Sequence, residues 1–227
     1  MSGQILPNWL AQRAASAPDL LALRFEEQRW TYAALDGWAS TLARQLAAAG
    51  AQPGERVALL LRNQPAFVAL LHAAPRLGVV LVPLNTRLAA PELAWQLGDV
   101  GAQTLLFDEE NAALAHEALA ALAQPPQAFS MNELAALPAS DVALQPTIDL
   151  DAIFTIIYTS GTTGRPKGAM LSYGNYWWSA VGSALNLGTH ATDRWLAVLP
   201  LFHVGGLSIA LRAVIYGIPM LLHASFD

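Results

Sequence analysis

The sequence predicts an α/β domain whose sheet is largely parallel. Short apolar runs alternate with longer alanine-rich stretches along the 227 residues, and this alternation is typical of strands joined by crossover helices. Hydrophobic residues make up 54% of the chain, and a chain of this size hides ~70% of its unfolded surface when it folds. The composition therefore supplies a core and excludes disorder.

The first part of the chain is expected to fold as a helix, a hairpin and a second helix. Pro7–Ser16 predicts the first helix, and Leu21–Phe25 with Trp30–Tyr32 predicts a small hairpin. Ala33–Ala49 predicts a long second helix, which Gly50 follows directly. Glycine commonly ends a helix because it accepts the left-handed conformation needed there.

A strand, a helix and a buried strand are expected next. Arg56–Leu61 predicts the first strand, Pro65–Leu77 a helix that ends at Gly78, and Val79–Pro83 the second strand. A further helix begins near Pro91, because proline is well tolerated in the first turn of a helix, and it runs to about residue 100. The strand Thr104–Phe107 follows, and then a less regular helix, strand and helix up to residue 137.

A surface connector is expected near residues 137–150, before the last predicted strand. The segment contains Pro138 and Pro146 and has neither helical nor strand periodicity. Ala152–Tyr158 is then a continuous apolar run, as expected for a strand buried on both faces. We therefore expect the functional part of the chain to begin where this strand ends.

Charge and cysteine content narrow the classes of function. Charged residues form only 13% of the chain, and 12 basic against 17 acidic residues give a net charge of −5, whereas a nucleic-acid-binding domain carries a basic patch. The absence of cysteine excludes a disulfide scaffold, a thiolate zinc site and a cysteine nucleophile. We find no signal peptide and no uncharged apolar stretch of about 18 residues, so we expect a cytoplasmic protein without an integral membrane segment.

A loop rich in glycine and hydroxyl groups follows the last predicted strand. Residues 158–168 have the sequence Y-T-S-G-T-T-G-R-P-K-G. Glycines permit the turns in which successive backbone N–H groups converge on one anion, while the hydroxyl groups and the lysine add donors and positive charge. The loop therefore predicts a polyphosphate site formed by Thr159, Ser160, Gly161, Thr162, Thr163, Gly164 and Lys167.

Other interpretations of this loop fit less well. A polar turn that merely contains glycine is the simplest alternative, but it does not explain the density of donors beside a lysine. A Walker A loop needs G-x-x-x-x-G-K-S/T, whereas Lys167 follows Pro166 and precedes Gly168. The G-x-G-x-x-G spacing of dinucleotide-binding domains is also absent.

The same string resembles the signature loop of the adenylate-forming superfamily, the acyl-CoA synthetases and their relatives. The resemblance implies the N-terminal portion of that superfamily's large domain, with mostly parallel sheets flanked by helices. It also implies that Lys167 and its neighbours hold the phosphates of ATP, with Mg²⁺, while a small-molecule carboxylate attacks the α-phosphorus. A thiol, usually coenzyme A, then displaces AMP. Tyr173 stands where relatives usually have histidine, and we expect little functional cost unless it alters the entry of the following helix.

A second segment that resembles the family is Leu199–Leu207, with the sequence L-P-L-F-H-V-G-G-L. In relatives this region borders the acyl pocket and the thiol tunnel, so the resemblance implies a catalytic and substrate-binding role for His203. The structural alternative is a histidine whose ring nitrogen caps the helix that follows.

The helix expected after this segment carries a single charge. Residues 207–216 are apolar nearly all round apart from Arg212, and Ser208 lies on the same helical face. A buried guanidinium keeps its proton and needs an anion. Arg212 therefore pairs with a protein carboxylate, lies at the surface, or binds a substrate carboxylate, and the last choice makes Ser208 and Arg212 substrate-binding residues for a diacid.

Segments 177–188 and 193–212 and the final S-F-D resemble, more closely, the o-succinylbenzoate:CoA ligases of menaquinone biosynthesis, whose substrate is an aromatic dicarboxylate. The resemblance is loose from residue 1 and sharp from about Ile153. Other acyl- or aryl-CoA synthetases and a non-catalytic ATP-binding remnant stay open, as does an unrelated NTPase, which would release ADP. Some side chains of the helix near 177–187 either touch the aromatic ring or pack in the core: Trp177, Trp178, Ser183 and Asn186.

The segments that relatives carry further along are missing before Asp227. They include the adenine and ribose contacts, a hinge and a small C-terminal domain with the adenylation lysine. We therefore expect residues 1–227 to be a partial AMP-binding large domain, with little complete ligase activity alone and no metal ligand that the sequence identifies. A homodimer is left open.

Overall fold

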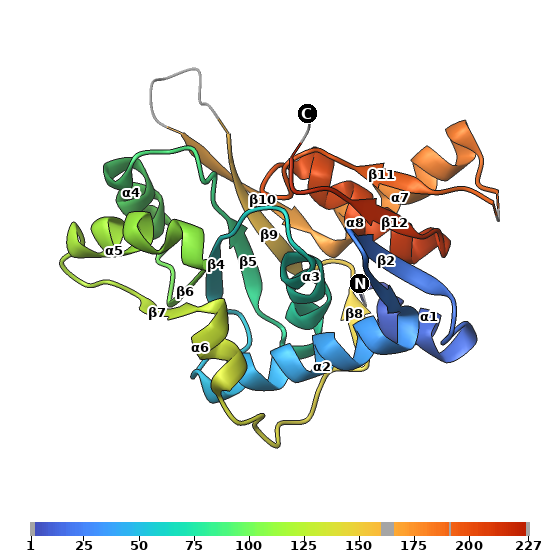
Figure 1. The fold of residues 1–227 in the computed structure, drawn as a ribbon, viewed down its shortest axis with the longest axis horizontal. Helices are drawn as coiled ribbons and strands as arrows, with labels where there is room; N and C mark the ends of the chain where they lie inside the picture. The colour runs from blue at the N-terminus through green and yellow to red at the C-terminus, as the bar shows by residue number, and fades with distance from the viewer. Residues whose placement is uncertain (1–2, 160–165, 191, 226–227) are drawn as a thin grey trace.

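A computed structural model of the chain describes residues 3–159, 166–190 and 192–225. Strands and helices alternate along most of its length (Figure 1). The strands are β1 (Ile5–Pro7), β2 (Leu21–Phe25), β3 (Gln28–Thr31), β4 (Arg56–Leu60), β5 (Val80–Pro83), β6 (Thr104–Phe107), β7 (Gln127–Ser130), β8 (Thr147–Asp149), β9 (Ile153–Thr159), β10 (Lys167–Ser172), β11 (Trp195–Ala197) and β12 (Met220–Leu222). The helices are α1 (Trp9–Ser16), α2 (Tyr32–Ala48), α3 (Pro65–Leu77), α4 (Ala90–Val100), a short 3₁₀ turn (Glu109–Asn111), α5 (Ala112–Ala120), α6 (Met131–Ala136), α7 (Tyr173–Leu187) and α8 (Val204–Tyr216).

The described strands form three sheets. The six-stranded sheet has the order β10-β9-β5-β4-β6-β7, and its neighbours are parallel except for the antiparallel pair β9–β10. The four-stranded sheet has the order β11-β12-β2-β3, with β2 and β3 as the antiparallel hairpin. Strands β1 and β8 form the third sheet. The predicted α/β class with mostly parallel strands is therefore confirmed.

Alternate residues of the central strands enter two separate cores. Leu59 of β4 and Leu81 of β5 pack with α2 and α3 on one face of the six-stranded sheet. Ala58 and Val82 pack with α4 and α5 on the other face. Successive strand residues point to opposite faces, so continuous apolar runs are what a sheet covered by helices on both faces requires.

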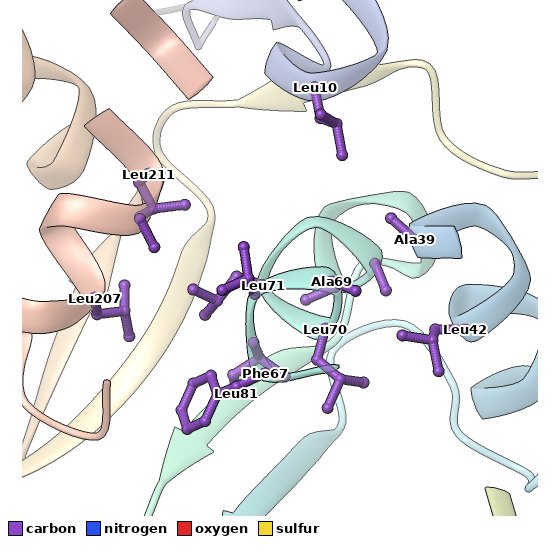
Figure 2. Close-up of a cluster of buried hydrophobic side chains, with 14 of the residues drawn as sticks. Leu10, Ala39, Leu42, Phe67, Ala69, Leu70, Leu71, Leu81, Leu207 and Leu211 are labelled. Atoms are coloured by element: carbon purple, nitrogen blue, oxygen red, sulfur yellow. The ribbon is translucent and has the colours of Figure 1, made fainter. Parts of the chain in front are cut away.

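Helix α3 lies at the centre of the larger core. Figure 2 shows its side chains surrounded by leucines and alanines from α1, α2, α8 and β5. The helix begins with Pro65 and ends at Gly78, which has a φ of 77°, so the predicted bounds 65–77 are confirmed. Within the described residues, no helix is both long and apolar enough to cross a membrane.

Side-chain caps move two predicted boundaries. The first helix begins at Trp9 rather than Pro7, because Asn8 caps it by accepting a hydrogen bond from the N–H of Ala11. Pro7 belongs instead to β1, which pairs with β8. The predicted strand 30–32 is wrong at Tyr32, where α2 begins, since Thr31 caps that helix. Residues 138–146 form no helix or strand, and β8 occupies the end of the segment expected to be a connector.

Candidate functional site

A cavity of about 510 Å³ opens where strands β5 and β9 end. In parallel α/β sheets, ligands bind outside the carboxyl ends of the strands, so the position is the expected one. Four parts of the chain line it: the end of β5 and the residues after it together with α4, the end of β9, the residue before β10, and the segment that leads into α8. The lining residues are Pro83, Asn85, Leu88, Glu92, Gln96, Ile157, Tyr158, Thr159, Pro166, Phe202, His203 and Val204.

The two ends of the predicted phosphate loop meet beside this cavity. Lys167 pairs with Thr159 across the antiparallel strands β9 and β10, and both residues are exposed. Thr159 lines the cavity, as does Pro166, the neighbour of Lys167. The other predicted loop residues lie outside the described part of the chain: Ser160, Gly161, Thr162, Thr163 and Gly164.

His203 lines the same cavity. It occupies the N-cap position of α8, yet its ring makes no capping hydrogen bond, so the alternative of a ring that caps the helix is wrong. The backbone fixes the residue instead: its N–H donates to the carbonyl of Pro200 at 3.1 Å, and its carbonyl accepts from Leu207 at 3.0 Å. The ring is exposed and lies 4.5 Å from that of Phe202.

Asn63 holds the segment before His203 and is a residue that the sequence analysis missed. Its amide nitrogen lies 3.1 Å from the carbonyl oxygens of both Leu199 and His223. Its amide oxygen accepts from the N–H of Leu201 at 2.8 Å. The side chain is 8% exposed, and three hydrogen bonds satisfy most of its capacity. Asn63 therefore ties the end of β4 to the loops of the four-stranded sheet.

Of the two glycines that follow Val204, Gly206 is the one that the local packing requires. A Cβ at this position would collide with the carbonyl oxygen of Pro200 and lie 2.8 Å from that of Leu199. The first turn of α8 can therefore approach the backbone of the preceding segment only because the residue has no side chain.

Ser208 and Arg212 lie further along α8 and are not among the residues that line the cavity. Both are half-buried. Arg212 donates from Nη2 to Ser179 Oγ on α7 at 2.8 Å, while its Nε is buried without a partner among the described residues. No carboxylate of the described chain forms an ion pair with it. At 1.5 Å per helical residue, Arg212 lies ~12 Å along α8 from Val204.

The aromatic residues near the start of α7 are mostly structural. Tyr173 is buried and stacks on Phe154 with ring centroids 4.4 Å apart, and burial raises the pKa of its hydroxyl. Trp177 stacks on Trp9 at 6.0 Å and packs against the larger core. Ser172 caps the helix by accepting from the N–H of Asn175 at 3.2 Å, so the histidine-to-tyrosine departure leaves the entry of α7 capped.

Other predicted positions on α7 lie nearer the surface. Trp178 is 56% exposed, Ser183 is half-buried and Asn186 is exposed. None of them lines the cavity. A contact between these residues and an aromatic substrate stays a prediction.

Comparison with known proteins gives consistent matches. The AMP-binding enzyme family matches residues 10–227. The 2-succinylbenzoate–CoA ligase of Geobacillus kaustophilus is 48% identical over 222 residues, which cover 98% of this chain and 44% of that protein.

Solved structures agree with the sequence matches. The o-succinylbenzoate CoA synthetase of Bacillus subtilis, in complex with the acyl-adenylate intermediate OSB-AMP, is 40% identical with a TM-score of 0.91, over 99% of this chain and 57% of that chain. The same enzyme in complex with ATP and magnesium ion also superposes with 40% identity and a TM-score of 0.91, over 99% of this chain and 59% of that one. The chain thus spans about half the length of the relatives that it matches.

Proposed function

The chain belongs to the AMP-binding enzyme family, and we propose that the protein to which it contributes activates a carboxylic acid with ATP and ligates it to coenzyme A. The observation that carries this proposal is the meeting of Thr159 and His203 in one cavity. Thr159 opens the loop predicted to bind phosphate, and His203 comes from the segment predicted to border the acyl group. That both residues line one cavity supports a site in which the phosphates and the acyl group lie close together.

In the proposed first step, an oxygen of the substrate carboxylate attacks the α-phosphorus of ATP. The bond to the β-phosphate breaks, pyrophosphate leaves, and an acyl-adenylate remains. Both reactants are anions and repel each other, so donors fixed beforehand around the phosphates lower the barrier. In this proposal Thr159 supplies a hydroxyl group and Lys167 a positive charge to the phosphates, and their pairing across the strand ends supports a joint role.

In the proposed second step, the thiol sulfur of coenzyme A attacks the acyl carbon and AMP leaves. His203 is exposed and lines the cavity. From there it orients the acyl group and the incoming thiol. Mg²⁺ would supply charge neutralisation on the phosphates, and because it prefers phosphate oxygens and water, it would be bound together with the nucleotide rather than in a protein cage.

The substrate that we propose is o-succinylbenzoate, converted to o-succinylbenzoyl-CoA for menaquinone biosynthesis. Arg212 supports an acid with a second carboxylate, because its buried Nε has no partner among the described residues and a buried donor left unpaired costs about 1–3 kcal/mol. Helix α8 leads from the cavity to this guanidinium, with Ser208 on the way. We place the enzyme in the cytoplasm, and a homodimer stays a prediction.

The test is carboxylate-dependent exchange of pyrophosphate into ATP by the full-length protein. We expect exchange with o-succinylbenzoate and little with benzoate or a medium-chain fatty acid. Faster exchange with the other acids would support the proposed acid–CoA ligase activity but contradict o-succinylbenzoate as the substrate. No exchange with any acid would reject the activity in favour of a non-catalytic ATP-binding protein, and release of ADP would indicate an NTPase.

The Lys167→Ala variant tests the phosphate side of the site separately. Loss of its charge should weaken ATP binding, while binding of the acid stays unchanged. Unchanged affinity for ATP would contradict the role given to Lys167.

A further inference from the structure

Tyr158, near the end of β9, is fastened to α4 by three contacts. Its hydroxyl donates to Asp99 Oδ2 at 2.7 Å and lies 3.2 Å from the backbone carbonyl oxygen of Gln96. Its ring meets Trp95 edge-on, with centroids 5.8 Å apart. All three partners lie within about one turn of the same helix, and the carboxylate acceptor makes the first hydrogen bond stronger than a neutral one.

The end of β9 needs such an anchor because the sheet holds it on one side only. Strand β5 pairs with β9 at a single position, Leu81 with Thr155. From there to Thr159 the register partner of β9 is β10, a strand whose first residues are exposed. The contacts of Tyr158 with α4 replace the support that a longer β5 would give.

The antiparallel pairing transmits the position of Tyr158 to the far side of the loop. Gly168 pairs with Tyr158, and Lys167 pairs with Thr159. A Cβ at Gly168 would lie only 2.8 Å from Ile156 Cγ2, so the glycine lets the Ile156 side chain lie against the backbone of β10. The ring of Tyr158 also lies beside this position, with its Cζ at an ordinary contact distance of 3.5 Å. A shift of Tyr158 would therefore move Thr159 and Lys167 together.

The same hydroxyl also joins two walls of the cavity. Glu92 and Gln96 of α4 line it together with Tyr158 and Thr159, and Gln96 is 3% exposed. Burial, and then the hydrogen bond and charge of Asp99, raise the pKa of Tyr158 above its ordinary value. The hydroxyl thus keeps its proton and remains a donor throughout the neutral pH range.

We propose that Tyr158 is a positioning residue: through its hydrogen bond to Asp99 it holds Thr159 and Lys167 where they bind the phosphates of ATP. The proposal rests on the proposed function for the identity of the ligand. Asp99 is exposed on α4 and does not line the cavity. Its substitution is nevertheless expected to change the affinity for ATP.

The experiment is calorimetric titration of the full-length protein with ATP and Mg²⁺. We expect Tyr158→Phe and Asp99→Ala each to raise the Kd for ATP roughly threefold to tenfold, the range in which residues that act through others modulate binding. Both substitutions remove the same hydrogen bond, between Tyr158 and Asp99. The Kd of the double variant for ATP should therefore be no higher than the higher of the two single-variant values. Asp99→Asn keeps an acceptor and should restore part of the affinity.

Tyr176→Phe is the matched control. This tyrosine also bonds to β9, through Thr155 Oγ1 at 2.7 Å, but it lies on α7 and away from the cavity. We expect the control to lower the unfolding temperature and to leave the Kd for ATP unchanged. An equal loss of affinity in this control would reduce the effect of Tyr158 to general stability and overturn the proposal.

The remaining outcomes separate this proposal from the function on which it rests. An unchanged Kd in Tyr158→Phe, or additive losses in the double variant, overturns the positioning role. A wild-type protein that binds ATP but shows no carboxylate-dependent exchange overturns the proposed ligase, while the Kd comparison still decides the role of Tyr158. A wild-type protein that does not bind ATP overturns both.

Discussion

Arg76 and Arg212 are both partly or fully buried, in different parts of the molecule, and their hydrogen-bond partners differ. Arg76 of α3 is 6% exposed and is satisfied by the protein itself. It forms an ion pair with Asp36 of α2 and donates to Ser40 Oγ at 2.9 Å and to the carbonyl oxygen of His72 at 3.1 Å. Its charge is part of the interface between α2 and α3.

Arg212 of α8 is half-buried and only partly satisfied. Its bond to Ser179 is to a neutral hydroxyl, and its buried Nε has no partner in the described part of the chain. A protein that needed this arginine for stability alone would gain more from a carboxylate partner, as it does at Arg76. The Arg76 guanidinium thus has its partners within the fold, whereas the unpaired Nε of Arg212 supports the proposal that Arg212 binds a substrate carboxylate.

The largest change in the free energy of unfolding is expected from substitution of Arg76. Arg76→Met should lower the free energy of unfolding by about 3 kcal/mol, because it leaves the Asp36 carboxylate without its partner in a mostly buried place. Arg212→Met, the matched control, should change it by less than ~1 kcal/mol. Urea unfolding of the two variants measures both values, and equal destabilisation would erase the distinction between the arginines.

His72, beside Arg76, gives the second effect, which depends on pH. Burial, with a smaller contribution from the charge of Arg76, lowers the pKa of His72 to about 3. The unfolded chain takes up this proton near the ordinary pKa of about 6.5, so the folded chain binds fewer protons between the two values. Uptake of this proton by the unfolded chain therefore does not lower the free energy of unfolding at pH values well above 6.5. As the pH decreases from 6.5 towards 3, it lowers the free energy of unfolding by up to ~1.4 kcal/mol per pH unit.

The check is the unfolding free energy at pH 7 and pH 5 for the wild type and His72→Leu. The histidine-free variant should lose less stability between these two pH values. Identical pH dependence in the two proteins would show that His72 is not the group that takes up the proton.

The smallest expected effect concerns the partner of Arg212. Ser179→Ala removes one hydrogen bond at the surface, so stability should fall by about 1 kcal/mol or less. The guanidinium becomes less fixed, and the KM for o-succinylbenzoate should rise by a factor of about 2 to 5, while the KM for a monocarboxylic acid stays the same. Steady-state exchange rates at varied acid concentration measure both. An equal rise for both acids would separate Ser179 from the second carboxylate.

Elements fixed by short-range signals could be predicted from the sequence. Helix α3 is bounded by Pro65 at its start and Gly78 at its end, both of which are local signals. Strand β6 consists of the β-branched Thr104 followed by three apolar residues. The phosphate site expected after Tyr158 rests on the same kind of signal, because its donors are consecutive in the chain, and it stays a prediction. In each case the residues that decide the structure lie next to one another.

Features fixed by distant partners could not be predicted. Strand β10 has the exposed sequence K-G-A-M-L-S, which shows no alternation, and it is a strand only because β9 pairs with it. Strand β1 contains Pro7 and pairs with β8, which follows Pro146 directly. The role of Asn63 could not be predicted from the sequence, because its three hydrogen-bond partners lie 136 to 160 residues away.

Binding of the second substrate carboxylate by Arg212 is tested by the ratio of kcat/KM for o-succinylbenzoate to that for benzoate, in ATP–pyrophosphate exchange. It is made on the full-length wild type and on Arg212→Met. If Arg212 binds the second carboxylate, the ratio should fall about a hundredfold in the variant, as expected when one partner of a buried charge pair is removed, with exchange on benzoate unchanged. A ratio that is the same in both proteins would contradict the account.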